Sequence, residues 1–414
     1  MRRGQSVRRL LMVVICLGAV QLHSAWQPLP APALVAVTRA TRGQRFNLTA
    51  WEVEAVAGKL ADGVRRPAAT LSEVEGEALV RDYLQMARRA GELAGEIERL
   101  YSDPTLADAA AASAAQRHDL AVLQVQLTEQ AAIVEAVLQE QLSTIIVAEG
   151  LTTAGLVWPP VRMRFSEPPA LLVVSPRSRI ERLRSVDLLP DLNSAQWAAI
   201  EQEVTANDPS LSAYVTGIGG YGVYPTMVVD RYGLPWSAET IAHEWIHNYL
   251  AFRPLGWSFL EGGPNVTINE TVASIAGEEL GRALLARYYP DLLPPPVAAQ
   301  ADPAPKDPNA FDFNVQMHQT RLRVDELLAA GQVDEAEAYM EAQRQVFVAH
   351  GYALRVLNQA YFAFHGSYAT GAAASDPIGP KLVRLRAASA SLRDFLHTVE
   401  GITSVAELDA ALGE

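Results

Sequence analysis

Residues 240–249 contain two histidines four positions apart, His243 and His247, with Glu244 directly after the first. On a helix, residues four apart project from the same face, about 6 Å apart along the axis. Two imidazoles placed in this way can bind one Zn²⁺, and Glu244 can reach a water molecule on the metal. Surface histidines on an amphipathic helix give the same five-residue pattern by accident. A second observation is needed to separate a zinc site from a chance match.

A third candidate ligand follows in the next helical segment. A Gly/Pro-rich turn comes after His247, and an apolar helix is expected to open near Asn269 and Glu270. A catalytic zinc site needs three protein ligands and an open fourth position for water. Glu270 offers an oxygen ligand at a suitable distance along the chain. The sequence therefore predicts a Zn²⁺ site made by His243, His247 and Glu270.

The two motifs together resemble the gluzincin metallopeptidases, which include thermolysin and the leukotriene-hydrolase-like aminopeptidases. These proteins place the third ligand in an N-E-x-x-[AS] helix after H-E-x-x-H, and this chain reads N-E-T-V-A over residues 269–273. The resemblance covers about residues 215–290. It implies a zinc peptidase for a peptide or protein substrate, whose extended backbone pairs with an edge strand. A strand predicted at 224–230, with Pro225 near its start, is the candidate for that edge.

The chain departs from the family pattern in three places. The gap between His247 and Glu270 is a few residues longer than usual. Ser274 stands where thermolysin-like enzymes have an acidic residue, so hydrogen-bond support for a ligand histidine must come from another residue. The segment that anchors a free amino terminus in the aminopeptidases has no counterpart, and the glycine-rich residues 217–224 lie in its place. The resemblance does not extend to aminopeptidase specificity.

The reaction that these residues imply is hydrolysis by a metal-activated water. Zinc lowers the pKa of its water from 15.7 toward about 7, and Glu244 would take the proton as general base. The resemblance also implies a Tyr or His donor for the oxyanion, supplied by the C-terminal helices. His365 and Tyr368, three apart near the end of an apolar helix, are the candidates, and Tyr361 is the next. The alternative for all three is packing, because aromatic-rich helix ends are usually core.

The elements that must position these residues form a predominantly helical α+β fold. We expect a small mixed sheet with the active-site helix, flanked by an N-terminal helical hairpin and a C-terminal helical subdomain. Shifts in composition predict six segments: a signal peptide or membrane anchor (1–25), a linker with a short helix (26–68), the hairpin (69–157), the zinc-binding domain (158–290), a proline-rich loop (291–312) and the helical subdomain (313–414).

Hydrophobic periodicity and turn residues give the bounds of the other elements. They predict a linker over 26–40, a short helix over 46–60 entered at Asn47, hairpin helices over 71–101 and 106–150, strands over 162–165 and 171–174, and helices over 193–205 and 352–364. Ser194 and Ser237 are the expected N-caps of the helix at 193–205 and of the zinc helix. The hairpin is expected to pack within the chain, with a dimerising coiled coil as the alternative.

Composition and charge argue against a nucleic-acid partner and a disulfide framework, and they indicate export. The 414 residues have a net charge of −13, from 34 basic and 47 acidic side chains, and no basic block follows the first nine residues. This balance argues against a nucleic-acid partner. A single cysteine, Cys16, excludes a disulfide framework. Basic residues 1–9 before an apolar run over 10–22 are typical of a secretory signal, so we expect export, or anchoring to the membrane by residues 10–26.

Three functions fit these residues. The first is a zinc metallopeptidase that acts outside the cytoplasm. The second is a non-proteolytic zinc hydrolase on the same scaffold, since a fold does not determine its substrate. The third is an inactive scaffold whose long helices bind a partner protein. Glu244 favours the two hydrolases, because a purely structural zinc site has no need of a general base.

Overall fold

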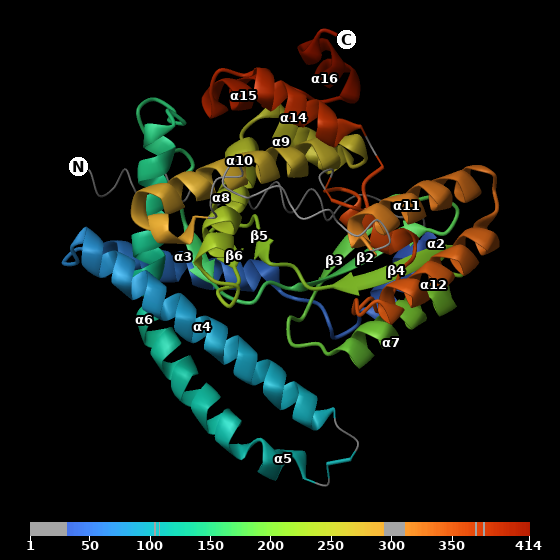
Figure 1. The fold of residues 1–414 in the computed structure, drawn as a ribbon, viewed down its shortest axis with the longest axis horizontal. Helices are drawn as coiled ribbons and strands as arrows, with labels where there is room; N and C mark the ends of the chain where they lie inside the picture. Colours follow the sequence, from blue (N-terminus) through green and yellow to red (C-terminus); the bar gives the residue numbers. More distant parts are fainter. Residues whose placement is uncertain (1–30, 103–104, 107, 294–310, 369–370, 376) are drawn as a thin grey trace.

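The computed structural model describes residues 31–293 and 311–414, apart from 103–104, 107, 369–370 and 376. The predicted N-terminal anchor at 10–26 and most of the proline-rich loop at 291–312 lie outside the described residues. Most of the described chain is helical, and six short strands form two three-stranded sheets (Figure 1). The predominantly helical α+β class is confirmed, with the strands divided between two sheets.

The N-terminal part contains more helix than the sequence predicted. The linker expected over 26–40 is wrong for its described part, because α2 (Ala31–Ala40) is a helix. Ala33, Val37 and Ala40 form a buried stripe that packs in the core of the second sheet. α3 (Leu48–Arg65) begins after Asn47, whose side chain accepts a hydrogen bond from the first turn, as expected. The small residues on one face of α2 let it pack against the sheet, and the composition of the segment did not indicate this.

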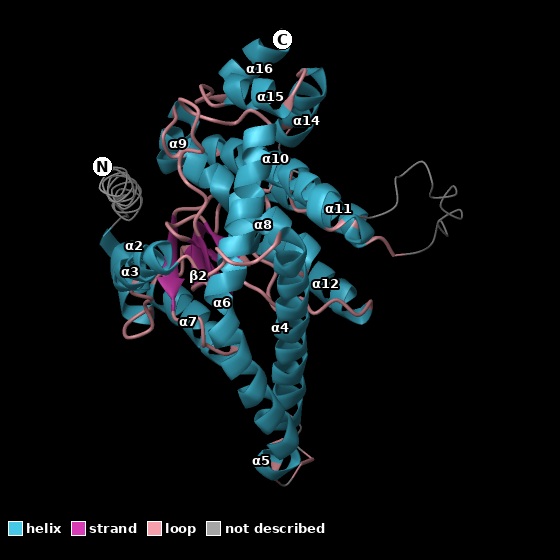
Figure 2. Cartoon of the chain, turned by 90° about the vertical axis from the view of Figure 1, so that its left-hand side faces the viewer, coloured by secondary structure: helices cyan, strands magenta, loops and turns pink. Residues whose placement is uncertain are grey.

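The predicted helical hairpin is present. It consists of α4 (Glu73–Tyr101) and α6 (Ala114–Ala148), joined through the short α5 (Ala109–Ala112). The α5 end extends away from the body of the molecule (Figure 2), whereas the C-terminal half of α6 is buried in the main core. Among the described helices, α6 has the length and hydropathy that a membrane span requires. A core helix has the same composition, and 44% of the apolar stretch of α6 is buried within the molecule.

The first sheet has the order β1-β6-β5: β1 (Met163–Phe165) is parallel to β6 (Thr226–Val228), and β5 (Gly220–Tyr221) is antiparallel to it. The edge strand predicted at 224–230 is therefore wrong, because β6 has a neighbour on each side and β5 lies at the edge. Pro225 precedes β6, where its missing N–H interrupts no ladder. The glycine-rich stretch thus supplies one of the two edge strands, and β1 is the other.

The second sheet is antiparallel with the order β3-β2-β4: β3 (Arg184–Leu188), β2 (Ala170–Pro176) and β4 (Leu211–Thr216). Successive side chains of β2 point to opposite faces. Leu172 packs with α2 and α7 (Ser194–Asn207), whereas Leu171 packs with α13 (Gln359–His365). The sheet lies between helices from both ends of the chain, which holds α13 close to the loops at the ends of β2.

Two helix starts differ from the prediction. Asn193, not Ser194, is the N-cap of α7, and its side chain accepts a hydrogen bond from the backbone of Gln196. The helix predicted over 352–364 is wrong for residues 352–358, because Asn358 caps α13 and starts it there. Both differences follow from the preference of asparagine for the N-cap position.

The C-terminal helices divide between two cores. α11 (Phe313–Ala329) and α12 (Val333–Ala349) pack with α13. The last three helices pack in the main core with the hairpin: α14 (Ile378–Ala388), α15 (Leu392–Val399) and α16 (Val405–Leu412). The predicted C-terminal helical subdomain therefore supports two different faces of the molecule (Figure 1).

Candidate metal centre

The predicted zinc helix is α8 (Leu234–Leu250). Gly233, with φ 85°, precedes the helix, and Pro235 lies in its first turn. Ser237 is therefore a fully buried residue inside the helix and not its N-cap, contrary to the prediction. Three large side chains of the helix are buried, namely Trp245, Ile246 and Tyr249. The histidines are thus carried by a rigid helix in the main core.

The second helix is α10 (Pro264–Tyr288), which begins earlier than predicted. Pro264 follows two glycines with positive φ, so the helix starts there and not near Asn269. Glu270 therefore projects from the second turn, where the backbone is already fixed. α9 (Pro254–Ser258) and the 3₁₀ turn at Phe259–Glu261 fill the connection from α8 to α10.

Two glycines one turn apart allow α8 and α10 to cross closely. A Cβ atom on Gly277 would lie 2.9 Å from Cα of His243, and one on Gly281 would lie 2.8 Å from Cα of Glu239. Any side chain at either position would push the helices apart. The close crossing brings Glu270 of α10 to the histidines of α8.

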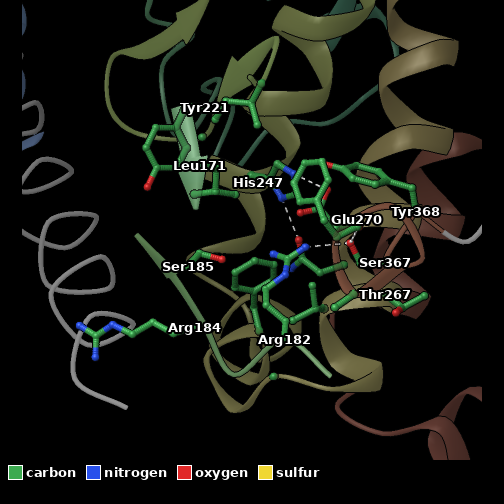
Figure 3. Close-up of a pocket in the computed structure, with 18 of the residues that line it drawn as sticks. Leu171, Arg182, Arg184, Ser185, Tyr221, His247, Thr267, Glu270, Ser367 and Tyr368 are labelled. Carbon is green, nitrogen blue, oxygen red and sulfur yellow. Dashed lines mark hydrogen bonds and ion pairs between the residues drawn. The ribbon is translucent and has the colours of Figure 1, made fainter. Parts of the chain in front are cut away.

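The three predicted ligands converge. Nε2 of His243 lies 3.0 Å from Nε2 of His247, and Oε2 of Glu270 lies 3.6 and 3.5 Å from these two atoms. Tetrahedral coordination with bonds of about 2.0–2.1 Å separates ligand atoms by roughly 3.3–3.4 Å, and the observed distances lie on both sides of this value. Oε2 of Glu270 is buried and has no hydrogen-bond partner in the described part of the chain. The group can hold a metal ion, and Figure 3 shows two of its members, His247 and Glu270.

Among the candidate ligands, Glu270 and His247 shift the pKa values of each other. Burial opposes ionisation of Glu270, but the imidazoles of His247 and His243 lower its pKa. Burial alone would also lower the pKa of His247, yet the Glu270 carboxylate raises it to about 9. A metal ion requires neutral imidazoles and an ionised carboxylate, so metal binding would displace the proton of His247.

Asn269 supplies the hydrogen-bond support that Ser274 does not. Its Oδ1 accepts from Nδ1 of His247 at 2.8 Å, which leaves Nε2 of that ring free as a ligand. The amide nitrogen of Asn269 donates to the carbonyl of Leu255 at 3.4 Å, which sets the orientation of the side chain. Ser274 instead donates to the backbone carbonyl of Glu270. Asn269 was not predicted as a site residue, although it is the asparagine of the N-E-x-x-A motif.

Glu244 lies beneath the glycine-rich stretch. A Cβ atom at Gly220 would collide with Oε1 of Glu244, and one at Gly222 would lie 3.2 Å from Oε2. Burial raises the pKa of the Glu244 carboxyl, although the two ligand histidines act against this rise. The glycines therefore give the carboxylate room next to the metal group and shield it from water, an environment that suits a general base.

The two candidate donors in the C-terminal part have different surroundings. Tyr368 lines the cavity of the metal group, and the charge of Glu270 is the main cause that raises its pKa. His365 does not line it: its ring lies 4.2 Å from that of Tyr361, and Nε2 lies 3.3 Å from the hydroxyl of Tyr214. The prediction that His365 faces the cleft is therefore wrong, and Tyr361 is packed beside it. α13 ends at His365, so Tyr368 lies beyond the helix. The spacing of three residues between His365 and Tyr368 therefore does not place them on the same helix face.

The metal group lies in the wall of a cavity of about 1290 Å³. Its lining comes from distant parts of the sequence: the start of α3, the loop between β2 and β3, residues 217–222, α8, the start of α10, and the turn after α13 (Figure 3). Typical small-ligand pockets have roughly 300–1,000 Å³. The cavity is therefore large enough for a substrate longer than one residue.

No protein-family model, curated protein or solved structure matches the chain. The arrangement itself provides two imidazoles and a carboxylate at metal-binding distances, with a second buried carboxylate beside them. Such a group can bind a divalent cation and move a proton next to it.

Proposed function

We propose that the protein is a zinc-dependent hydrolase of gluzincin type, and that it is a metallopeptidase. The observation that carries this proposal is the convergence of His243, His247 and Glu270 from two closely crossed helices beside the buried Glu244. Two imidazoles and one carboxylate are a usual ligand set of catalytic zinc, and three protein ligands leave a fourth position open. When bound, Zn²⁺ would supply a Lewis acid and a water of lowered pKa.

Glu244 and Tyr368 have complementary roles in this proposal. Glu244 takes the proton from the attacking water and delivers it to the leaving amine. Its raised pKa supports both steps, because a carboxyl group with a pKa closer to neutrality holds and releases a proton more readily. The hydroxyl of Tyr368 stays protonated, since Glu270 raises its pKa, and donates a hydrogen bond to the oxyanion.

The position of β5 supports a peptide as the substrate. Gly220 and Tyr221 form the edge of the first sheet and line the cavity. An edge strand offers backbone groups to an extended chain, so β5 takes the role that the family resemblance assigned to residues 224–230. The glycine at 220 permits close approach of backbone to the catalytic carboxylate. We propose that the protein is exported or anchored to the membrane, and that it cleaves peptides or proteins outside the cytoplasm.

The test is metal analysis of the purified full chain, followed by incubation with a peptide library and mass spectrometry of the products. We expect one zinc per chain and cleavage that stops on chelation and returns with zinc. Bound zinc without cleavage of any peptide would favour a non-proteolytic hydrolase. Absence of stoichiometric zinc would contradict the proposal and leave a scaffold function.

A further inference from the structure

Arg182 is a charged residue of the cavity that the proposed reaction does not use. It lies in the loop at 177–183, between β2 and β3. Its side chain lines the same cavity as His247 and Tyr368, and Figure 3 shows its guanidinium directed to Ser367.

The arginines of this loop differ in their partners. Arg177 forms a two-pronged ion pair with Glu337, with distances of 2.7 and 2.5 Å. Arg179 pairs with Glu181 at 2.5 Å. Arg182 forms no ion pair within the described residues, and its hydrogen bond goes to a neutral hydroxyl. Of these three arginines, Arg182 is therefore the one that lines the cavity and has no ion pair among the described residues.

Neutral groups hold Arg182 in position. Nη2 donates to Oγ of Ser367 at 3.0 Å, and the guanidinium carbon lies 5.5 Å from the ring centre of Phe364. Ser367 in turn donates to the carbonyl of Phe364 at 2.7 Å, so its oxygen is oriented to accept from the arginine. Nε of Arg182 is buried and has no acceptor among the described residues. A buried donor without an acceptor is unfavourable, and a ligand oxygen would supply the missing partner.

The charge of Arg182 also acts on its neighbours. Glu270 raises the pKa of Tyr368, and Arg182 opposes that rise. Burial lowers the pKa of His365 to about 4, and Arg182 contributes in the same direction. The field of this cation thus extends over the wall made by α13 and the turn after it.

We propose that Arg182 binds a carboxylate of the substrate. The inference rests on the proposed hydrolase function, because it assigns the substrate of the same cavity. A guanidinium presents its donors in a planar fork that matches a carboxylate. Next to it, Leu171, Ile218 and Phe364 contribute an apolar part of the wall. A C-terminal residue with an apolar side chain satisfies both features, so the substrate class is peptides cut close to a free carboxyl terminus.

The test measures peptide binding by calorimetry to the full chain carrying Glu244→Gln, which prevents consumption of the peptides. Three peptides are compared: acetyl-Ala-Ala-Leu with a free carboxylate, its C-terminal amide, and acetyl-Ala-Asp-Leu amide, whose carboxylate is in a side chain. We expect the free acid to bind roughly 10- to 100-fold more tightly than its amide, the range of a charge-assisted hydrogen bond. The acid-to-amide ratio needs no change at Arg182, so it is informative even if a variant fails to fold.

Substitutions in the same background assign the effect to one residue. Arg182→Met is expected to bring the acid and the amide within twofold, and Arg182→Lys to retain part of the preference, because it keeps the charge but not the fork. Arg179→Met is the matched control on the same loop and should leave the ratio unchanged. A further outcome is that acetyl-Ala-Asp-Leu amide binds more tightly than acetyl-Ala-Ala-Leu amide and loses this gain in Arg182→Met. That result would support Arg182 as the carboxylate-binding residue, with the carboxylate supplied by a substrate side chain.

Equal affinity for acid and amide, no measurable binding of any peptide, or a preference that survives Arg182→Met would overturn the proposal. The binding ratio is measured with and without zinc, so it does not depend on turnover. Cleavage of the same peptides by the unsubstituted chain tests the hydrolase function separately. A chain that prefers the acid but cleaves nothing would support the carboxylate anchor and contradict the peptidase.

Discussion

His247 in α8 and His365 at the end of α13 are both largely buried, yet their pKa values are shifted in opposite directions. The Glu270 carboxylate overcomes burial and raises the pKa of His247 to about 9, whereas burial lowers that of His365 to about 4. The first histidine faces a carboxylate and a second imidazole, and the second faces the rings of Tyr361 and Tyr214. Burial alone therefore does not identify a functional histidine; the anionic partner does.

The same contrast separates the residues around the two histidines. Glu244 and Tyr368 face the metal group, whereas Tyr361 packs against the His365 ring. If this division is correct, substitutions around the metal group change zinc binding or turnover at unchanged stability. Substitutions around His365 change stability at unchanged chemistry.

The largest effect is expected for Glu244→Gln. The amide keeps the shape of the side chain and removes the base, so kcat should fall by about 10²–10⁴ while the zinc content stays at one per chain. Steady-state kinetics on the best library peptide, together with metal analysis, check this outcome. Turnover within a factor of two of the unsubstituted chain would exclude Glu244 as the general base.

Tyr368→Phe should lower kcat by about 10²–10³, because it removes one donor to the oxyanion. His365→Phe is the matched aromatic variant and should keep kcat within about threefold, since its ring does not line the cavity. Zinc content and melting temperature are measured for both. The reverse pattern, with activity lost in His365→Phe and kept in Tyr368→Phe, would invert the roles assigned to the two residues.

Asn269→Ala should weaken zinc binding by about 10- to 100-fold, because His247 loses the acceptor that orients its ring. Ser274→Ala is the control on the same helix, since the hydrogen bond of the Ser274 hydroxyl goes to the backbone carbonyl of Glu270 and not to a ligand side chain. Competition with a fluorescent zinc chelator gives both affinities. Similar losses in the two variants would show that helix stability, and not ring orientation, accounts for the effect.

The smallest effect concerns acid stability and His365. Its folded-state pKa of about 4 lies below the ordinary value of about 6.5, so the unfolded chain binds the proton more readily and stability is lost as the pH falls below about 6.5. Between pH 7.5 and pH 5.5 this residue should cost roughly 1.4 kcal/mol of unfolding free energy. Urea unfolding of the chain and of His365→Phe at both pH values measures it. An unchanged pH dependence in the variant would show that His365 titrates normally.

The sequence was most informative where chemistry depends on local spacing. His243, Glu244 and His247 share one helix, so their relation follows from helical geometry. Glu270 was identified by its motif, although α10 begins five residues before the predicted start. The long hairpin was predicted from its periodicity, because helices of this length repeat the pattern many times.

Predictions failed where contacts between distant segments decide the outcome. The edge strand was assigned to residues 224–230, but its partner β1 comes from 163–165 and leaves β5 at the edge. His365 and Tyr368 could not be separated, because the end of a short helix depends on how α13 packs on β2. Arg182 was not predicted as a functional residue, because only the fold directs it into the cavity.

The most direct test of the account is zinc stoichiometry in the ligand variants and in the His365 control. We predict one zinc per chain after exhaustive dialysis of the unsubstituted protein and of His365→Phe. His243→Ala, His247→Ala and Glu270→Ala should each retain less than about a tenth of that amount, because each leaves only two protein ligands. Full stoichiometric zinc in any of these three folded variants, or loss of zinc in His365→Phe, would contradict the assignment of the metal centre.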